Sequence, residues 1–114
     1  MINILNLRSG KPKHPWEFKV DRSSPLGNPY NMLHESERDI VCDKYRKWFY
    51  TYTHDDSFFA YLKLMVNSYK KYKKLNLFCW CHPERCHAET IKEYLKTIKE
   101  YLENDKISIR ENNG

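Results

Sequence analysis

The chain predicts an α/β fold in which helices pack on an open sheet, and three observations support this class. Short apolar segments rich in β-branched and aromatic residues, typical of strands, occur at the N-terminus and after residue 74. Between and after them, apolar residues recur every three or four positions, as in amphipathic helices. The last predicted strand leads directly into a helix, which is the arrangement of a small Rossmann-like open sheet.

Three strands are expected in this sheet. The first covers Ile2–Arg8, which is short, apolar and partly β-branched. A loop over Ser9–Pro15, marked by one Gly and two Pro, leads to a second strand over Glu17–Arg22. Leu75–Cys81 is a continuous apolar and aromatic run of strand length, so we expect it at the centre of the sheet.

Two helices are expected between the second and third strands. Ser36 begins a segment that resembles a capping box, and one apolar face then continues to Tyr52. A break at His54–Ser57 separates this helix from the next one, which repeats the same apolar spacing. Either of the last two residues of the break, Asp56 or Ser57, is expected to cap the second helix.

The clearest helical pattern comes last, with apolar residues from Ala88 to Leu102 on one face and Lys and Glu on the other. A final edge strand is expected over Lys106–Arg110. The predicted order is therefore β-β-α-α-β-α, with this strand after it. We expect one domain over residues 1–114, with an ordered core of about 2–104 and a C-terminal tail over 105–114.

Composition restricts the class of protein further. The chain is 40% hydrophobic and 31% charged, as in globular domains, and no apolar run approaches the roughly 18–20 residues of a membrane-spanning helix. The N-terminus has no signal-peptide pattern, which predicts a cytoplasmic protein with no membrane partner. In that compartment the four cysteines are expected as thiols or metal ligands rather than disulfides. The net charge of +5 favours anionic partners.

The segment Cys79–His87 gathers most of the chemically active side chains. Its sequence is Cys-Trp-Cys-His-Pro-Glu-Arg-Cys-His, and it joins the third strand to the last helix. Because side chains alternate along a strand, Cys79 and Cys81 are expected on one face. Cys86 and His87 are expected in the first turn of the helix, whose free amides attract anions and lower thiol pKa values.

Three interpretations of this segment remain open. Cys79, Cys81, Cys86 and His87 offer four ligands for a tetrahedral zinc ion, although the spacing is not that of a standard zinc finger. Alternatively, Cys86 is a catalytic nucleophile that His87 assists. In the third interpretation the cysteines are small buried side chains beside a pocket, with Arg85 and His87 as its polar contacts.

The motifs of the chain resemble those of the domain-of-unknown-function family 4326, short proteins from bacteria and their phages. Leu26–Tyr30 reads Leu-Gly-Asn-Pro-Tyr, Tyr45–Trp48 reads Tyr-Arg-Lys-Trp, and the Cys79–His87 segment carries the family's Cys-Trp-Cys-x-Pro-x-x-Cys-His pattern. The resemblance extends from about Asn3 to Leu95. The matching positions are Arg8, Arg22, Gly27, Asn28, Pro29, Arg38, Tyr45, Trp48, Cys79, Trp80, Cys81, Pro83, Cys86 and His87.

The resemblance also shows one departure and implies a role. The family usually has Gly-Asp after the Cys-His pair, where this chain has Ala88 and Glu89, so the acidic group is kept but the glycine is not. As a family of unknown function it implies a fold and a site, but no reaction. Its occurrence in phages suggests a protein of the bacterial host cytosol, with the countering of a nucleotide-signalling defence as one role.

Together these features predict a pocket for a small anionic ligand of the nucleotide type. Arg8, Arg22 and Asn28 are expected on one side of it, and Cys79, Cys81, Cys86 and His87 on the other. Gly27, Arg85 and Glu89 complete the expected ligand-binding set. If the second and third strands are parallel neighbours, Arg22, Asn28, Cys86 and His87 line one pocket at the same edge of the sheet.

Two alternative functions come from other classes. A zinc-stabilised module that binds nucleic acid would use the segment Tyr69–Lys74, in which tyrosines and lysines alternate. The ordinary interpretation of that segment is the solvated end of a helix. A thiol-dependent transferase or hydrolase would instead use Cys86 and His87 as tentative catalytic residues.

Overall fold

The computed structural model describes residues 1–52, 54–82 and 84–98. Three parallel strands form an open sheet in the order β1-β3-β2. Strand β1 spans Ile2–Asn6, β2 spans Glu17–Lys19, and β3, which spans Leu75–Cys79, lies between them. The predicted α/β class and the central position of the third strand are confirmed.

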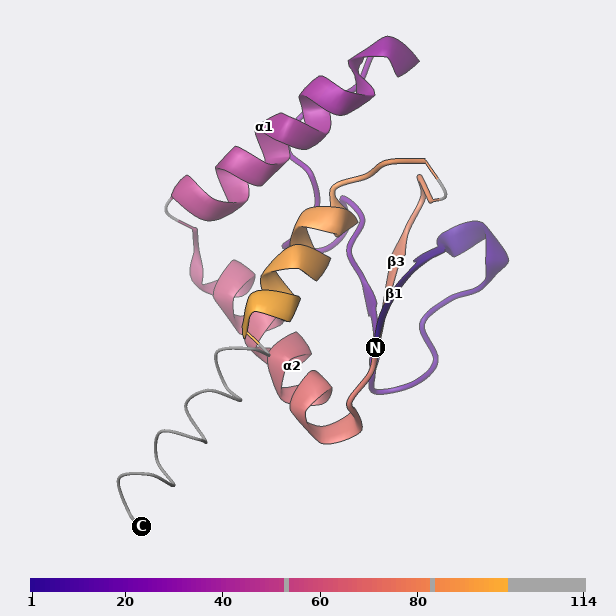
Figure 1. Ribbon diagram of the computed structural model, residues 1–114, viewed down its shortest axis with the longest axis vertical. Coiled ribbons are helices and arrows are strands. Elements are labelled where there is room, and N and C mark those ends of the chain that lie inside the picture. The colour runs from indigo at the N-terminus through magenta and orange to yellow at the C-terminus, as the bar shows by residue number, and fades with distance from the viewer. Residues whose placement is uncertain (53, 83, 99–114) are drawn as a thin grey trace.

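Helices follow in the predicted order, and Figure 1 shows them gathered on one side of the sheet. Short 3-10 turns cover Leu7–Ser9 (η1) and Glu35–Glu37 (η2). The long helices are α1 over Arg38–Thr51 and α2 over Asp56–Tyr72, and residues 88–98 form a further helix. The sequence thus predicted every α-helix within the described residues.

The cap of α2 differs from the prediction of Asp56 or Ser57. Asp55 is the N-cap, because its carboxylate accepts a hydrogen bond from the backbone N–H of Phe58 at 3.0 Å. Ser57 instead donates its hydroxyl to the same carboxylate at 2.7 Å. An aspartate three residues before the donor amide has the reach that capping requires, so the helix begins one residue after it.

The strands end earlier than expected because polar side chains turn the chain at their carboxyl ends. The Asn6 side chain accepts from the N–H of Arg8 at 2.8 Å and begins η1, which ends β1 before Arg8. After β2, the Asp21 carboxylate accepts from the N–H of Ser23 at 3.1 Å and starts a turn. All three strand exits therefore lie at the same edge of the sheet.

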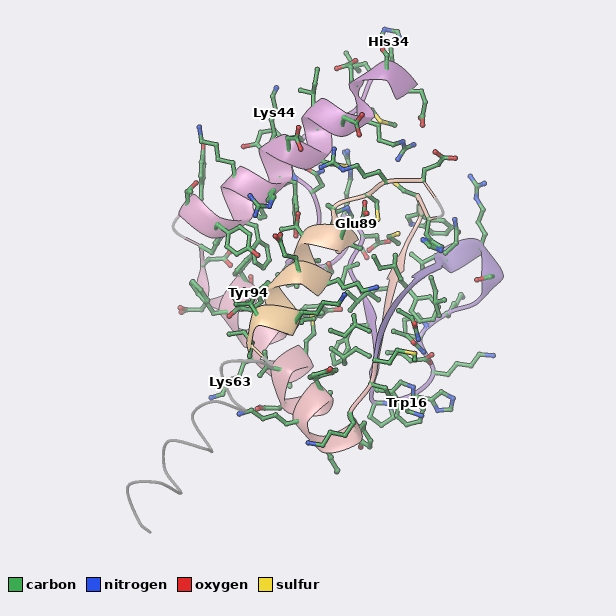
Figure 2. The ribbon with its side chains drawn as sticks, viewed as in Figure 1. Trp16, His34, Lys44, Lys63, Glu89 and Tyr94 are labelled. Atoms are coloured by element: carbon green, nitrogen blue, oxygen red, sulfur yellow. The ribbon has the colours of Figure 1, made fainter. Side chains whose placement is uncertain are left out.

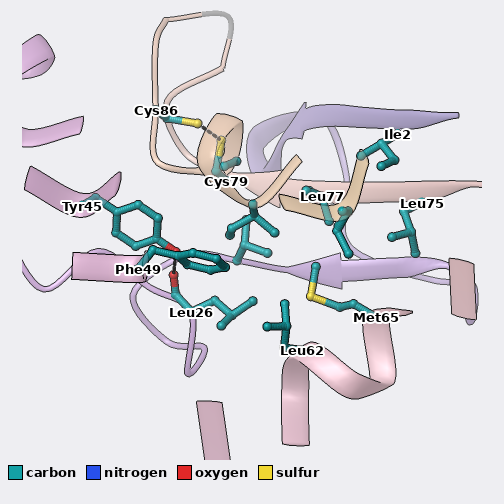
Figure 3. Packing of buried hydrophobic residues seen from close by; sticks show 14 of the residues in the cluster. Ile2, Leu26, Tyr45, Phe49, Leu62, Met65, Leu75, Leu77, Cys79 and Cys86 are labelled. Atoms are coloured by element: carbon teal, nitrogen blue, oxygen red, sulfur yellow. Dashed lines mark hydrogen bonds between the residues drawn. The ribbon is translucent and has the colours of Figure 1, made fainter. Parts of the chain in front are cut away.

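The core lies between the helices and one face of the sheet, as Figure 3 shows. Leu75, Leu77 and Cys79 alternate along β3 and are all buried on this face. The fully buried Tyr45 of α1 reaches across to donate its hydroxyl to the carbonyl of Leu26 at 2.7 Å. This bond fixes α1 to the segment that follows β2 without leaving a buried polar group unpaired.

The opposite face of the sheet is partly polar. The Asn3 side chain donates to the Asn76 side chain at 3.2 Å, and Asn76 donates to the Glu17 carboxylate at 2.8 Å. These hydrogen-bonded side chains connect all three strands. Glu17 also accepts from the N–H of Lys13 at 2.9 Å. The connection from β1 to β2 is thereby attached to this face, with no α-helix in it.

Several expectations fall on the C-terminal part of the chain. The end of the last predicted helix, the edge strand over Lys106–Arg110 and the tail over 105–114 lie outside the described residues. Within the described part, no helix has both the length and the apolar character that crossing a membrane requires.

Candidate functional site

A cavity of about 400 Å³ lies at the carboxyl ends of β2 and β3. Three segments far apart in the sequence form its wall. They are the segment after β2, the first turns of α1, and the segment after β3 that leads into the last helix. The lining residues are Asp21, Arg22, Asn28, Met32, Arg38, Val41, Cys42, Trp80, Cys81, Arg85, Cys86 and His87.

The four residues expected to share a pocket, Arg22, Asn28, Cys86 and His87, all line this cavity. Their meeting follows from the topology. Because β2 and β3 pair in parallel, the chain leaves both strands at the same edge, and the two segments meet there.

Asp21 connects the two strand exits. Its carboxylate accepts from the Trp80 indole N–H at 3.0 Å and from the backbone of Ser23. Burial alone would raise the pKa of Asp21, but the hydrogen bonds from Ser23 and Trp80 outweigh burial, and the pKa is lowered. An ionised Asp21 therefore holds the Trp80 ring at the edge of the cavity, where 53% of the residue is exposed.

Gly27 shapes the segment after β2 rather than contacting a ligand. A Cβ atom at this position would lie 2.5 Å from the Cα of Arg22 and 2.5 Å from the carbonyl oxygen of Asp21. Only a residue without a side chain fits against that backbone. Gly27 is not among the residues that line the cavity, so the structure gives it a packing role.

Arg22 and Asn28 fix the loop and still present polar groups to the cavity. Arg22 donates to the side chain of Asn31 and, at 2.8 Å, to the carbonyl of Tyr30. Asn28 accepts from the N–H of Tyr30 at 2.8 Å. The side-chain amide nitrogen of Asn28 has no hydrogen-bond partner among the described residues. Arg22 likewise has no carboxylate within ion-pair distance among those residues.

Arg38 and Arg85 join α1 to the segment after β3. Arg38 donates to the backbone carbonyl of Arg85 at 2.9 Å and forms a fork with Glu35 at 2.6 and 2.8 Å. Arg85 in turn donates to Asp39 at 3.0 Å and to Asp43 at 2.8 Å. The pKa of each guanidinium is raised, chiefly by these carboxylates, so both stay charged.

His87 is buried at the inner end of the cavity. Its Nε2 contacts the backbone carbonyl of Val20, an acceptor only, so Nε2 carries the proton and Nδ1 has a free lone pair. Burial, with a smaller contribution from Arg22, lowers the pKa of His87 and keeps the ring neutral. Nδ1 has no hydrogen-bond partner in the described part of the chain, where fully buried polar side-chain atoms are all paired, so Nδ1 is not fully buried.

Two of the cysteines are in direct contact. The Sγ atoms of Cys79 and Cys86 are 3.2 Å apart, and both residues are buried. The hydrogen bond from Cys86, helped by nearby backbone N–H groups, lowers the pKa of Cys79 against the effect of burial. The same bond and burial raise the pKa of Cys86. The pair thus loses one proton readily and holds the other.

The arrangement does not fit the expected zinc site. No three His, Cys, Asp or Glu side chains are grouped to hold a metal within residues 1–52, 54–82 and 84–98, which include Cys79, Cys81, Cys86 and His87. His87 directs Nε2 at a carbonyl, and Cys79 lies in the core beneath the cavity while Cys81 lines its wall. A tetrahedral site needs four donors around one point.

Three predicted ligand residues lie elsewhere. Arg8 is exposed in η1 after β1, on the far side of β3 from β2, and is not part of the cavity wall. Glu89 accepts a hydrogen bond from the backbone N–H of Cys86 at 3.1 Å, as the acidic residue of a capping box does. Cys79 is 1% exposed and packs in the core.

Other lining residues were missed by the sequence reasoning. Arg38 matched the family pattern but was not placed in the site, and Cys42 had no assigned role. The arginine at the first position of α1 was the available signal, since the start of that helix faces the strand exits. Trp80 also matched the family pattern without being placed in the site, whereas Asp21 gave no such signal, because its hydrogen bond to Trp80 joins segments 59 positions apart.

The lysine-rich segment Tyr69–Lys74 lies at the other end of the sheet, near Trp16 in Figure 2. Its four lysines are exposed, but its tyrosine rings pack against other parts of the protein and are not positioned to stack on nucleic-acid bases. Tyr69 packs against the core, and Tyr72 contacts the Trp16 ring at a centroid distance of 5.4 Å. This arrangement corresponds to the solvated helix end that the sequence also allowed.

The comparison with known families matches residues 5–97 to the family described as Domain of unknown function (DUF4326). The chain belongs to this family. The match covers both strand exits and the whole of α1, so every residue that lines the cavity falls within it. No curated protein and no solved structure matches the chain. The resemblance read from the motifs is therefore confirmed.

Proposed function

We propose that this protein binds a small anionic ligand of the nucleotide type in the cavity between β2, β3 and α1. One observation carries the proposal. Three arginines from three different segments, Arg22, Arg38 and Arg85, line the same cavity together with Asn28 and His87, each of which has a side-chain nitrogen without a partner among the described residues. A volume of about 400 Å³ lies within the range of small-molecule sites.

Arg22 is the residue best suited to the anionic group. Arg38 and Arg85 are already paired with carboxylates, so much of their charge is balanced locally. Among the residues that the structure describes, Arg22 is bonded only to the neutral oxygens of Asn31 and Tyr30, and its guanidinium has five N–H groups. Its positive charge is therefore available to a phosphate or carboxylate, which guanidinium groups bind through two parallel hydrogen bonds.

A planar group has a surface available at the other side. The Trp80 indole is anchored by Asp21 and half exposed, and Met32 and Val41 add apolar surface. Aromatic side chains of this kind stack on bases, whichever base is present. The neutral His87 would accept a hydrogen bond at Nδ1 from a hydroxyl or a ring N–H, and Asn28 would donate one.

The geometry favours binding over covalent catalysis through Cys86. Its thiol contacts Cys79 and its pKa is raised, whereas a catalytic thiol needs a lowered pKa. Nothing in the contacts of His87 directs it at Cys86, because its protonated nitrogen is bonded to Val20. The proposal therefore assigns Cys86 to the wall of the cavity.

The experiment is native mass spectrometry of protein purified directly from cells, followed by calorimetric titration. We expect a bound small molecule in the first, or affinity for nucleoside monophosphates above that for inorganic phosphate in the second. Arg22→Ala and His87→Ala should remove this binding. Arg46→Ala is the matched control, because Arg46 is an exposed arginine of α1 that does not line the cavity and is paired with Glu93 of the last helix.

The proposal is wrong if the protein carries no small molecule and binds no member of a panel of nucleoside monophosphates. It is also wrong if Arg22→Ala binds them as the unaltered protein does while its fold is retained.

A further inference from the structure

Cys79 and Cys86 form a pair that the binding function does not use. Cys79 is the last residue of β3, and Cys86 lies at the start of the last helix. Figure 3 shows their sulfur atoms facing each other in the buried cluster, 3.2 Å apart. Cys79 does not itself line the cavity, so ligand binding does not explain the contact.

We propose that Cys79 and Cys86 are a redox-active dithiol that a hydroperoxide converts reversibly into a disulfide. The proposal is independent of what the cavity binds. It also changes the sequence-based expectation, in which compartment and spacing favoured free thiols or metal ligands over a disulfide.

The geometry needs little adjustment for this bond. A disulfide has an S–S distance of about 2.05 Å, so the two sulfurs must approach by roughly 1 Å. Cys86 follows the exposed residues Glu84 and Arg85 and lies outside the ladder of β3, so it is the partner that moves. Cys79 is fixed in the ladder of β3, opposite Asn6, and serves as the stationary partner.

Access to an oxidant comes through Cys86. This residue lines the 400 Å³ cavity and also a larger hollow of about 810 Å³ between β1 and the last helix. Although only 4% of Cys86 is exposed, it is thus reached from two sides. Cys79 is 1% exposed and lines neither space, so we assign the first attack to Cys86.

The chemistry balances with hydroperoxide as the oxidant. As the Cys86 sulfur attacks one peroxide oxygen, its proton passes to the Cys79 thiolate that it contacts, an S–O bond forms, the O–O bond breaks, and the departing hydroxide leaves as water with the proton that the pair had released. The Cys79 sulfur then attacks the sulfenic sulfur of Cys86, the S–O bond breaks, and a second water leaves with the Cys79 proton. Two thiols and one peroxide give one disulfide and two waters.

Oxidation would close a ring around the segment that carries Trp80, Cys81 and Arg85, three residues of the cavity wall. The wall would lose freedom to move relative to β3. A cellular peroxide level would in this way act on the cavity without contacting its ligand.

The test is mass spectrometry of the folded full chain after hydrogen peroxide, with and without later reduction. We expect the intact mass to fall by two hydrogen atoms, the titratable thiols of the denatured protein to fall from four to two, and reduction to reverse both. Trypsin cuts after Arg85 and so separates the Cys79 peptide from the Cys86 peptide, which must then appear joined by a bond that reduction breaks.

Matched serine variants identify the pair. Cys42→Ser and Cys81→Ser should still lose two hydrogen atoms, whereas Cys79→Ser and Cys86→Ser should not. Because Cys79 and Cys81 share a tryptic peptide, a cross-link that survives in Cys81→Ser excludes Cys81 as the partner. A cross-link that requires Cys42 or Cys81, or oxygen addition to Cys86 with no cross-link in the folded protein, would overturn the proposal.

Discussion

The arginines around the cavity and the lysines at the end of α2 carry charge of the same sign but are held in different ways. Arg22, Arg38 and Arg85 each donate to at least two identified oxygens, and the bonds of Arg38 and Arg85 join α1 to the segment after β3. The lysines of Tyr69–Lys74 form no ion pair within the described residues. Lys74 lies over the Trp16 ring at 4.0 Å and Lys71 over Tyr72 at 5.3 Å.

This difference shows what distinguishes a built site from a charged surface. The planar guanidinium of an arginine forms several directed hydrogen bonds, which hold both the side chain and the backbone that it contacts in place. The ammonium group of a lysine is flexible and does neither. The net positive charge of the chain alone is compatible with an anion-binding site in either region. Only the arginines are tied to segments that enclose a cavity, and the following predictions test that contrast.

Arg38→Met should cause the largest loss of stability. The change leaves the Arg85 carbonyl and the Glu35 carboxylate without their donor, and the Arg38 side chain is only 16% exposed. We expect the free energy of unfolding in urea to fall by about 1.5–3 kcal/mol. Arg46→Met, on the same helix but 56% exposed, should cost at most about 1 kcal/mol. Equal losses would mean that Arg38 is an ordinary surface residue.

Gly27→Ala should have the next largest effect. The added Cβ would overlap the backbone of Asp21 and Arg22, so the segment after β2 must shift. Overpacking of this kind costs about 1–3 kcal/mol of unfolding free energy. Nucleoside monophosphate affinity should fall as well, because Arg22 moves with that backbone. An unchanged unfolding curve would show that the close approach at Gly27 is absent in solution.

His87 should make the folded protein sensitive to mild acid. Burial lowers its pKa below the ordinary 6.5, so the unfolded chain binds a proton that the folded chain rejects. The free energy of unfolding is therefore greatest above about pH 6.5, and it falls as the pH drops toward the lowered pKa of His87 in the folded protein. Melting temperatures measured between neutral and mildly acidic pH should show this fall in the unaltered protein and less of it in His87→Gln.

His82→Gln supplies the control for that measurement. His82 is exposed in the same segment, and its replacement should leave the pH dependence as it is. The account of His87 fails if His87→Gln keeps the full acid sensitivity.

In the lysine segment a substitution should raise stability instead. Lys73 ends α2 with φ of 62°, in the left-handed region that favours glycine. Lys73→Gly should therefore increase the free energy of unfolding by about 0.5–1 kcal/mol. The matched change Lys71→Gly, in the last turn of α2, should reduce it by up to about 1 kcal/mol. A loss of stability in Lys73→Gly would contradict this prediction and would show that the Lys73 side chain makes a stabilising contact.

The elements of the fold were predictable because each has a periodic pattern of its own. The run Leu75–Cys81 and the spacing of the last helix identified the strand-to-helix corner, and parallel pairing then brought Arg22 and His87 together. Strand ends were less predictable, since they depend on whether Asn6 or Asp21 turns back to its own backbone.

Contacts between distant segments could not be read in the same way. Nothing local indicates that Arg38 reaches the Arg85 carbonyl or that the thiols of Cys79 and Cys86 meet. Arg8 does not line the same cavity, because an exit at the same edge does not ensure a shared cavity when β3 lies between. The capping role of Glu89 was readable, because it follows Cys86 by three positions, the spacing of a capping box.

The most direct test of the binding site is one calorimetric titration series with nucleoside monophosphates. It compares the unaltered protein, Arg22→Ala, and a variant with Lys70, Lys71, Lys73 and Lys74 all changed to alanine. The account predicts binding in the first, its loss in the second, and unchanged affinity in the third. Affinity that survives Arg22→Ala but disappears with the four lysines would contradict it and would place the ligand at the end of α2.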